Sequence, residues 1–232
     1  MPRITGIYFV LSLAILCGLS LGREVGAENE DYVGVPARIT PFDSRYRRVQ
    51  RYLDSSDLLR RSDSGPAQES DSPNHIAVLK EYLKMASRFE HVPDGKDRDG
   101  AVHGDPSDPS VKNRSSRDYW QLPQETESRG TGDCEDKAIW LYARLIQIGF
   151  ENVRLVVGKY RVDEPAYHAW VVHNFTGKTY ILDPTINDGL WDARRYPKGF
   201  YQPLYSYSKD KRWRHSEGYR YLAPNSIRNS ND

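Results

Sequence analysis

A cysteine, a histidine and an aspartate are spaced along the chain in a way that suits nucleophilic catalysis. Cys134 lies between the glycine-rich stretch 130–132 and a segment predicted to be helical. The positive end of a helix dipole stabilises a thiolate at such a position. Asp133, Glu135 and Asp136 act in the opposite direction, because nearby carboxylates raise the pKa of a thiol. Cys134 therefore needs a basic partner before it can act as a nucleophile.

A predicted β-hairpin supplies that partner. Its two strands are expected over 167–173 and 178–183. A turn centred just after Phe175 places His168 directly opposite Asp183, and a turn one residue further on makes the pair diagonal but leaves both on one face. A five-residue loop would separate them onto opposite faces. In the first two registers an imidazole stands beside a carboxylate that can orient it, which predicts acyl-transfer chemistry by a thiol.

The motifs around these three residues resemble the transglutaminase-like superfamily. They are Gly132-Asp133-Cys134-Glu135-Asp136, His168-Ala169-Trp170, Leu182-Asp183-Pro184-Thr185 and, upstream, Asp118-Tyr119-Trp120 with Pro123 and Glu125. The upstream motif is most similar to the bacterial transglutaminase-like cysteine peptidases. The resemblance covers residues 118–186, about a third of the chain.

The resemblance implies an α+β fold with a papain-like core, in which a nucleophile helix packs on an antiparallel sheet. It implies Cys134 as nucleophile, His168 as general base and acid, and Asp183 as the orienting carboxylate. The reaction would pass from an amide through a thioester to water or to an amine. The backbone N–H of the cysteine and an upstream side chain, Trp120 or Gln121, are the candidates for holding the oxyanion.

The resemblance also bears on metal binding. Some members of the superfamily bind calcium through acids that flank the cysteine, which here implies a calcium site at Asp133 and Glu135. The chemistry itself requires no cofactor. His173 is predicted to be a surface residue at a strand end. The remaining histidines have no zinc-ligand spacing; they are His75, His91, His103 and His215.

Helical and extended segments surround the motif-bearing residues. Apolar periodicity predicts helices over 42–61, 74–89 and 133–148, and further strands over 153–160 and near 201–208. We expect a weakly structured arm and linker over 28–73, a transglutaminase-like domain over 74–222 and a disordered tail over 223–232.

The N-terminal residues have the order of a secretory signal peptide. Residues 6–21 carry no charge, and Val25 and Ala27 provide the small residues of a cleavage site. The run is shorter than the about 20 residues that a membrane span needs. Removal of residues 1–27 would leave Cys134 as the one cysteine, with no membrane span remaining. We therefore expect an exported protein, periplasmic or secreted.

Composition narrows the class of partner. The 232 residues include 33 Lys+Arg and 32 Asp+Glu, and a net charge of +1 argues against a nucleic-acid binder. The expected partner is a protein or peptide substrate. The leading hypothesis is an exported cysteine peptidase or amidase. The alternatives are a protein-crosslinking acyltransferase, which would use the same residues, and a binding module with this fold but without catalysis.

Overall fold

The computed structural model describes residues 35–55, 73–94, 119–186, 189–209 and 211–215. The predicted signal peptide 1–27 and tail 223–232 lie outside these residues. Within them, no helix combines the length and the apolar character that crossing a membrane requires.

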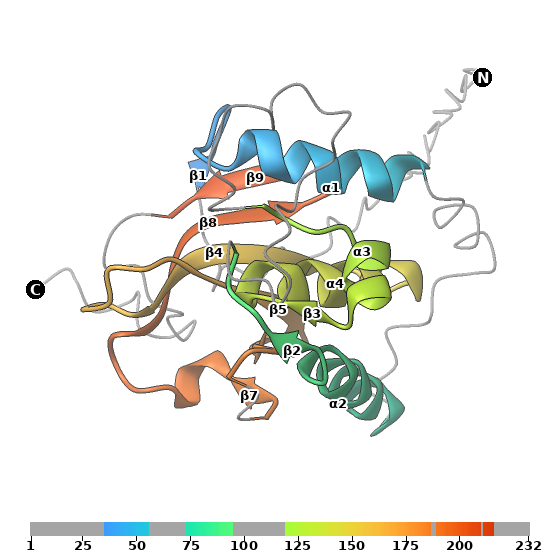
Figure 1. The fold of residues 1–232 in the computed structure, drawn as a ribbon. Coiled ribbons are helices and arrows are strands. Elements are labelled where there is room, and N and C mark those ends of the chain that lie inside the picture. Colours follow the sequence, from blue (N-terminus) through green and yellow to red (C-terminus); the bar gives the residue numbers. More distant parts are fainter. Residues whose placement is uncertain (1–34, 56–72, 95–118, 187–188, 210, 216–232) are drawn as a thin grey trace, which may run out of the picture.

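A single antiparallel sheet of seven strands forms the centre of the described molecule (Figure 1). In spatial order its strands are β1 (Val35–Pro36), β9 (Lys211–Arg214), β8 (Phe200–Ser208), β4 (Val153–Arg161), β5 (His168–Phe175), β6 (Lys178–Leu182) and β7 (Trp191–Asp192). A small parallel pair stands apart from it, formed by β2 (Glu90–His91) and β3 (Thr131–Gly132).

Helices pack on one face of this sheet. They are α1 (Asp43–Ser55), α2 (Pro73–Ser87), α3 (Pro123–Arg129) and α4 (Cys134–Gln147), with a short 3-10 turn, η3 (Ala193–Arg195), near β7. Nine side chains of α4 are buried, including the charged ones of Asp136 and Lys137. The helix is therefore a core helix rather than a surface one. The expected α+β fold is confirmed, with the helix that begins at Cys134 packed on an antiparallel sheet.

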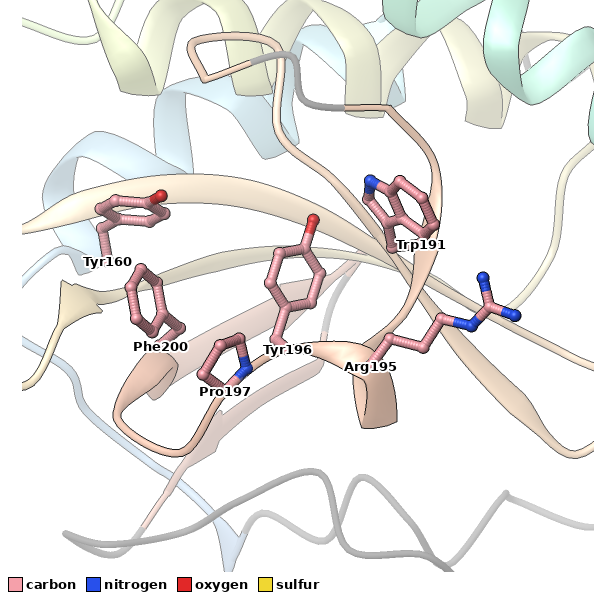
Figure 2. Close-up of a pocket in the computed structure, with 6 residues that line it drawn as sticks. All are labelled: Tyr160, Trp191, Arg195, Tyr196, Pro197 and Phe200. Carbon is pink, nitrogen blue, oxygen red and sulfur yellow. The ribbon is translucent and has the colours of Figure 1, made fainter.

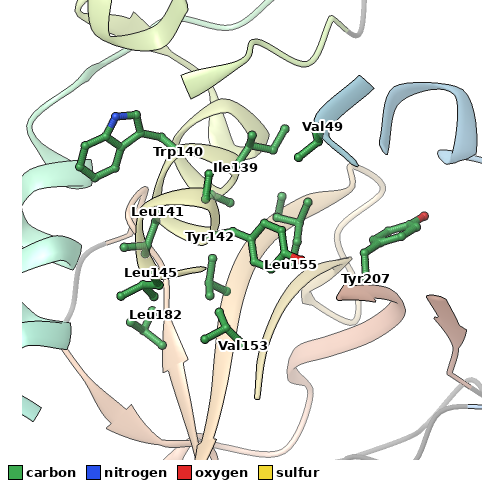
Figure 3. Packing of buried hydrophobic residues seen from close by; sticks show 14 of the residues in the cluster. Val49, Ile139, Trp140, Leu141, Tyr142, Leu145, Val153, Leu155, Leu182 and Tyr207 are labelled. Atoms are coloured by element: carbon green, nitrogen blue, oxygen red, sulfur yellow. The ribbon is translucent and has the colours of Figure 1, made fainter. Parts of the chain in front are cut away.

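Alternation along β4 and β5 divides the core into two layers. Leu155 and Val171 point toward α4, whereas Val156 and Trp170 point to the other face, as the period of two in a strand requires. Figure 3 shows the first layer, in which side chains of α4 meet those of the sheet and Val49 of α1. The second layer is smaller and is closed by residues around Tyr201.

The hairpin between β5 and β6 adopts the diagonal register. Val171 pairs with Leu182 and Phe175 with Lys178, so the turn consists of Thr176 and Gly177. Both turn residues have positive φ, 47° and 70°, which is the conformation of a type I′ turn. Of the two registers that keep the pair on one face, the second is therefore the one present.

The N-terminal arm is more ordered than its sequence suggests. Over residues 35–55 it forms β1 and α1, and the stripe of Tyr46, Val49 and Leu53 is buried in the main core. The hydroxyl of Thr40 shares a 2.6 Å hydrogen bond with that of Tyr207. The local sequence shows only a narrow apolar stripe here. The surfaces that bury it include Tyr142 of α4 and Tyr207 of β8, which lie far along the chain.

Candidate active site

The N-terminus of α4 is fixed by a buried carboxylate. Asp136 accepts hydrogen bonds from the backbone N–H of Asp133 at 3.2 Å and from that of Gln121 at 2.7 Å. A Cβ at Gly132 would lie 2.7 Å from the Cβ of Asp136, so only glycine allows this approach. Cys134, the first residue of α4, is thereby held against the segment that begins at residue 119.

Cys134 and His168 line the same cavity, which has a volume of about 160 Å³. Its lining residues are Phe42, Trp120, Cys134, Glu135, Val157, Tyr167, His168 and Ala169. Of the two candidates for holding the oxyanion, Trp120 is among them and Gln121 is not, although both are buried. Phe42, which the sequence placed in the weakly structured arm, forms part of the wall.

The structure also brings His168 and Asp183 together. Nε2 of His168 lies 2.6 Å from Oδ2 of Asp183, and the carboxylate is buried. The other oxygen, Oδ1, accepts the backbone N–H groups of Thr185 and Ile186 at 2.9 and 3.1 Å. Because both oxygens are bonded, the carboxylate has a fixed orientation and in turn fixes the imidazole ring.

Tyr201 is a further member of this arrangement, and no motif in the sequence predicted its role. Its hydroxyl donates to Oδ2 of Asp183 at 3.0 Å, and its side chain is buried. Its backbone has a φ of +47°, which is strained for a residue with a Cβ. The pairing of β8 with β4 shifts at Gly158, where any Cβ would come within 2.1 Å of the carbonyl oxygen of Gln202. On β8 the irregularity lies at Leu204, which has no partner on β4 and comes three residues after Tyr201.

The thiol has a different partner from the expected one. Sγ of Cys134 donates to Oε2 of Glu135 at 3.0 Å. Burial raises the pKa of the Cys134 thiol well above its ordinary value, and the charges of Glu135 and Asp133 raise it further. In this arrangement of the side chains a thiolate on Cys134 is disfavoured, because burial and the flanking carboxylates both raise the pKa of the thiol.

The acids beside Cys134 form a cluster with a third member from elsewhere in the chain. Asp94, Asp133 and Glu135 each place one carboxylate oxygen within 4.8 Å of the others. Burial raises the pKa of Asp133 and of Glu135, and repulsion from Asp133 adds to the effect on Glu135. Oδ1 of Asp133 is buried without a hydrogen bond among the described residues. Oxygen ligands with unbalanced negative charge fit a hard cation such as calcium.

The upstream motif has a positioning role. Arg48 of α1 pairs with Oε1 of Glu125 at 2.7 Å and donates to the backbone carbonyl of Trp120 at 2.8 Å. Glu125 also accepts the hydroxyl of Tyr119 and the backbone N–H of Leu122, at 2.9 and 2.6 Å. These bonds hold the backbone on both sides of Trp120, so its ring stays beside the cysteine.

His173 is buried, and its predicted surface position is wrong. It is 2% exposed, and its Nε2 lies 2.8 Å from Nε2 of His75 on α2. The two rings pack with Phe150 and Phe175. Burial lowers the pKa of His173 to about 4, and the neighbouring His75 lowers it as well. The apolar residues that flank His173 on its face of β5 are the signal that could have predicted this.

Comparison with known proteins gives a likeness to solved structures. Neither a protein-family model nor a curated protein sequence matches the chain. The solved structures that are similar include LapG of Legionella pneumophila in an EGTA-treated form, at 22% identity and a TM-score of 0.46, over 73% of this chain and 85% of that one. The calcium-bound form of the same protein matches at 22% identity and 0.46, over 72% and 86%.

Proposed function

We propose that this chain is a cysteine peptidase or amidase that cleaves an amide bond of a protein or peptide substrate. The observation that supports it most directly is the cavity that Cys134 shares with His168, whose ring is hydrogen-bonded to the buried Asp183. The resemblance of the surrounding motifs to transglutaminase-like peptidases agrees with this assignment. Export through residues 1–27 is part of the proposal.

The residues have distinct roles in the proposed reaction. His168 takes the thiol proton, and Sγ of Cys134 attacks the carbonyl carbon of the amide. The backbone N–H of Cys134 and the side chain of Trp120 face the oxyanion. His168 then gives the proton to the leaving amine, which departs and leaves a thioester. Water, deprotonated by His168, attacks the thioester to release the acid and restore the thiol, while Asp183 keeps the ring oriented throughout.

The carboxylate cluster determines when the thiol is available. Asp94, Asp133 and Glu135 are the residues that would hold calcium. Bound calcium would neutralise these carboxylates. Glu135 must release Sγ of Cys134 before the sulfur can exchange its proton with His168. We therefore expect the reactive form of Cys134 to be the calcium-loaded one.

Alkylation of Cys134 tests the proposal without a substrate. The rate of reaction with iodoacetamide would be measured against pH, with calcium and with EGTA. We expect calcium to move the rise in rate to a lower pH, since a histidine-paired thiolate forms below the ordinary thiol pKa of about 8.5. His168→Ala should abolish that shift, whereas His173→Phe should leave it in place.

A rate that rises only above about pH 8 under both conditions would contradict the nucleophile assignment. A thiol that stays inert throughout would instead favour the non-catalytic binding module. Water and amine acceptors use the same residues, so a peptidase and a crosslinking enzyme would give the same alkylation profile. Incorporation of a labelled primary amine into protein distinguishes these two.

A further inference from the structure

A second, larger cavity lies on the face of the sheet opposite α4. Its volume is about 420 Å³, within the range of small-molecule and side-chain binding pockets. It is lined by Tyr160, Trp191, Arg195, Tyr196, Pro197 and Phe200. Figure 2 shows these side chains ranged from Tyr160 and Phe200 at one end to Trp191 and Arg195 at the other.

The walls of this cavity touch the residues of the candidate active site. The ring of Tyr160 meets that of His168 edge-on, with centroids 5.8 Å apart. The ring of Tyr196 lies 4.6 Å from that of Tyr201, which bonds Asp183. An extended chain advances about 3.3–3.6 Å per residue. A substrate with its scissile bond beside His168 would therefore place a residue about two to four positions away at this cavity.

The chemistry of the lining defines what would bind. Four aromatic rings and a proline provide apolar surface, and the Trp191 side chain is 40% exposed. The guanidinium of Arg195 lies 5.6 Å from the ring of Trp191 and makes no ion pair with the described part of the chain. The neighbouring Asp192 is bonded by Arg194 instead. The cavity thus combines an apolar wall with a guanidinium that has no ion-pair partner among the described residues, at the end remote from His168.

We propose that this cavity is a substrate subsite that takes an aromatic or large aliphatic side chain, with an acidic residue next to it on the side remote from the scissile bond. The apolar side chain would lie among Tyr160, Tyr196 and Phe200, and the carboxylate would meet Arg195. This assignment deepens the proposed function and rests on it, because the occupant is a segment of the polypeptide being cleaved.

Cleavage of a tryptic peptide library from a whole proteome tests the subsite. We expect cleaved peptides to be enriched in an aromatic or large aliphatic residue two to four positions from the scissile bond, beside Asp or Glu. Arg195→Glu should remove the acidic preference and raise KM for such peptides at least fivefold with kcat unchanged, and Trp191→Ala should weaken the apolar preference. Lys198→Glu, a matched charge reversal at an exposed residue outside the lining, should change neither.

A binding measurement separates the subsite from the catalytic proposal. N-acetyl-Asp-Phe-amide and N-acetyl-Lys-Phe-amide would be titrated into the full chain carrying Cys134→Ala, with the indole N–H of Trp191 followed by NMR. We expect the first probe to shift this signal at lower concentration than the second, and Arg195→Glu to reverse their order.

The outcomes are distinguishable. Cleavage without the expected enrichment, or an indole signal that neither probe moves at 10 mM (about the weakest binding such a fragment shows), would overturn the subsite and leave the peptidase proposal intact. An absence of cleavage together with an inert Cys134 would overturn the peptidase and, with it, the assignment of this cavity to a substrate.

Discussion

The two histidines of β5 show how position on a strand decides what an imidazole can do. His168 and His173 are five residues apart and therefore face opposite sides of the sheet. His168 lines a cavity and is bonded to Asp183, whereas His173 is buried and bonded to a second imidazole, that of His75. The residue type is the same, but the partner and the access to the cavity differ.

The difference lies in the partner of each imidazole. At the first site the buried carboxylate of Asp183 holds the ring of His168 in place beside the cavity. At the second site, burial and a neighbouring imidazole both oppose charge, and the pKa of His173 falls to about 4. The first pair has the arrangement that the proposed proton transfer needs, and the second joins α2 to the sheet.

The largest expected effect comes from substituting each of the two histidines separately. His168→Ala should lower kcat on a cleaved peptide by roughly 10³-fold, because the general base and acid is lost. His173→Phe should leave kcat within about twofold, since this residue is on the other face of the sheet. Steady-state kinetics on both variants checks the contrast. A similar loss of kcat in the two variants would show that His168 contributes only to the stability of the fold.

The second test is the pH dependence of stability. Because the pKa of folded His173 is about 4 and that of the unfolded residue about 6.5, the unfolded state binds more protons between these values. The free energy of unfolding should therefore fall as the pH drops from about 6.5 to 4, by about 3 kcal/mol from this residue.

Urea unfolding at several pH values measures this effect. His173→Phe removes the titrating group from its apolar site and should flatten the profile between these pH values relative to the parent protein. Parallel profiles for the two proteins would mean that the imidazole pair does not resist protonation, and the contrast with His168 would fail.

The smallest expected effect concerns the hydrogen bond from Tyr201 that supports the His168–Asp183 pair. Tyr201→Phe removes a hydroxyl that holds Oδ2 of Asp183, and we expect kcat to fall about tenfold with KM unchanged, the loss of one hydrogen bond to a charged group. Tyr207→Phe removes an equally buried hydroxyl, bonded to Thr40, and is the matched control.

The nitrogen chemical shifts of His168 distinguish positioning from general destabilisation. They report which ring nitrogen carries the proton, and Tyr201→Phe should disturb them while Tyr207→Phe should not. If both variants lost the same stability and neither altered the histidine shifts or kcat, Tyr201 would be a packing residue only.

Local patterns in the sequence predicted most of what surrounds Cys134. The helix expected over 133–148 occurs as Cys134–Gln147, and the strand expected over 153–160 occurs as Val153–Arg161. These segments have strong apolar periodicity, and Gly149, with a φ of +89°, lies just after the helix. For the hairpin, the sequence left three turn lengths open, of which two keep His168 and Asp183 on one face, and the structure has one of these two.

Contacts between distant segments could not be predicted. Asp94 joins the acids beside Cys134 from 39 residues upstream of Asp133, and Tyr201 reaches Asp183 from 18 residues downstream. Neither has a local pattern that marks it, since its role depends on how the segments pack. The protonated state of Cys134 also depends on such packing, because burial and the direction of the Glu135 side chain decide it.

The docking of α1 has a consequence for the order of events during translation. Its anchors are on β9 and at Lys209, directly after β8: Asp43 pairs with Arg212 at 2.8 Å, and the hydroxyl of Tyr46 donates to the backbone carbonyl of Lys209 at 2.8 Å. The ring of Phe42 packs edge-on against Tyr205. Until the ribosome has released β8 and β9, Phe42 lacks its contact with Tyr205 and α1 lacks both anchors, so the wall that Phe42 forms in the cavity of Cys134 is incomplete. A nascent chain therefore carries its cysteine for some 70 residues of synthesis (about the span from Cys134 to Tyr205) before the enclosure that would make it selective can close.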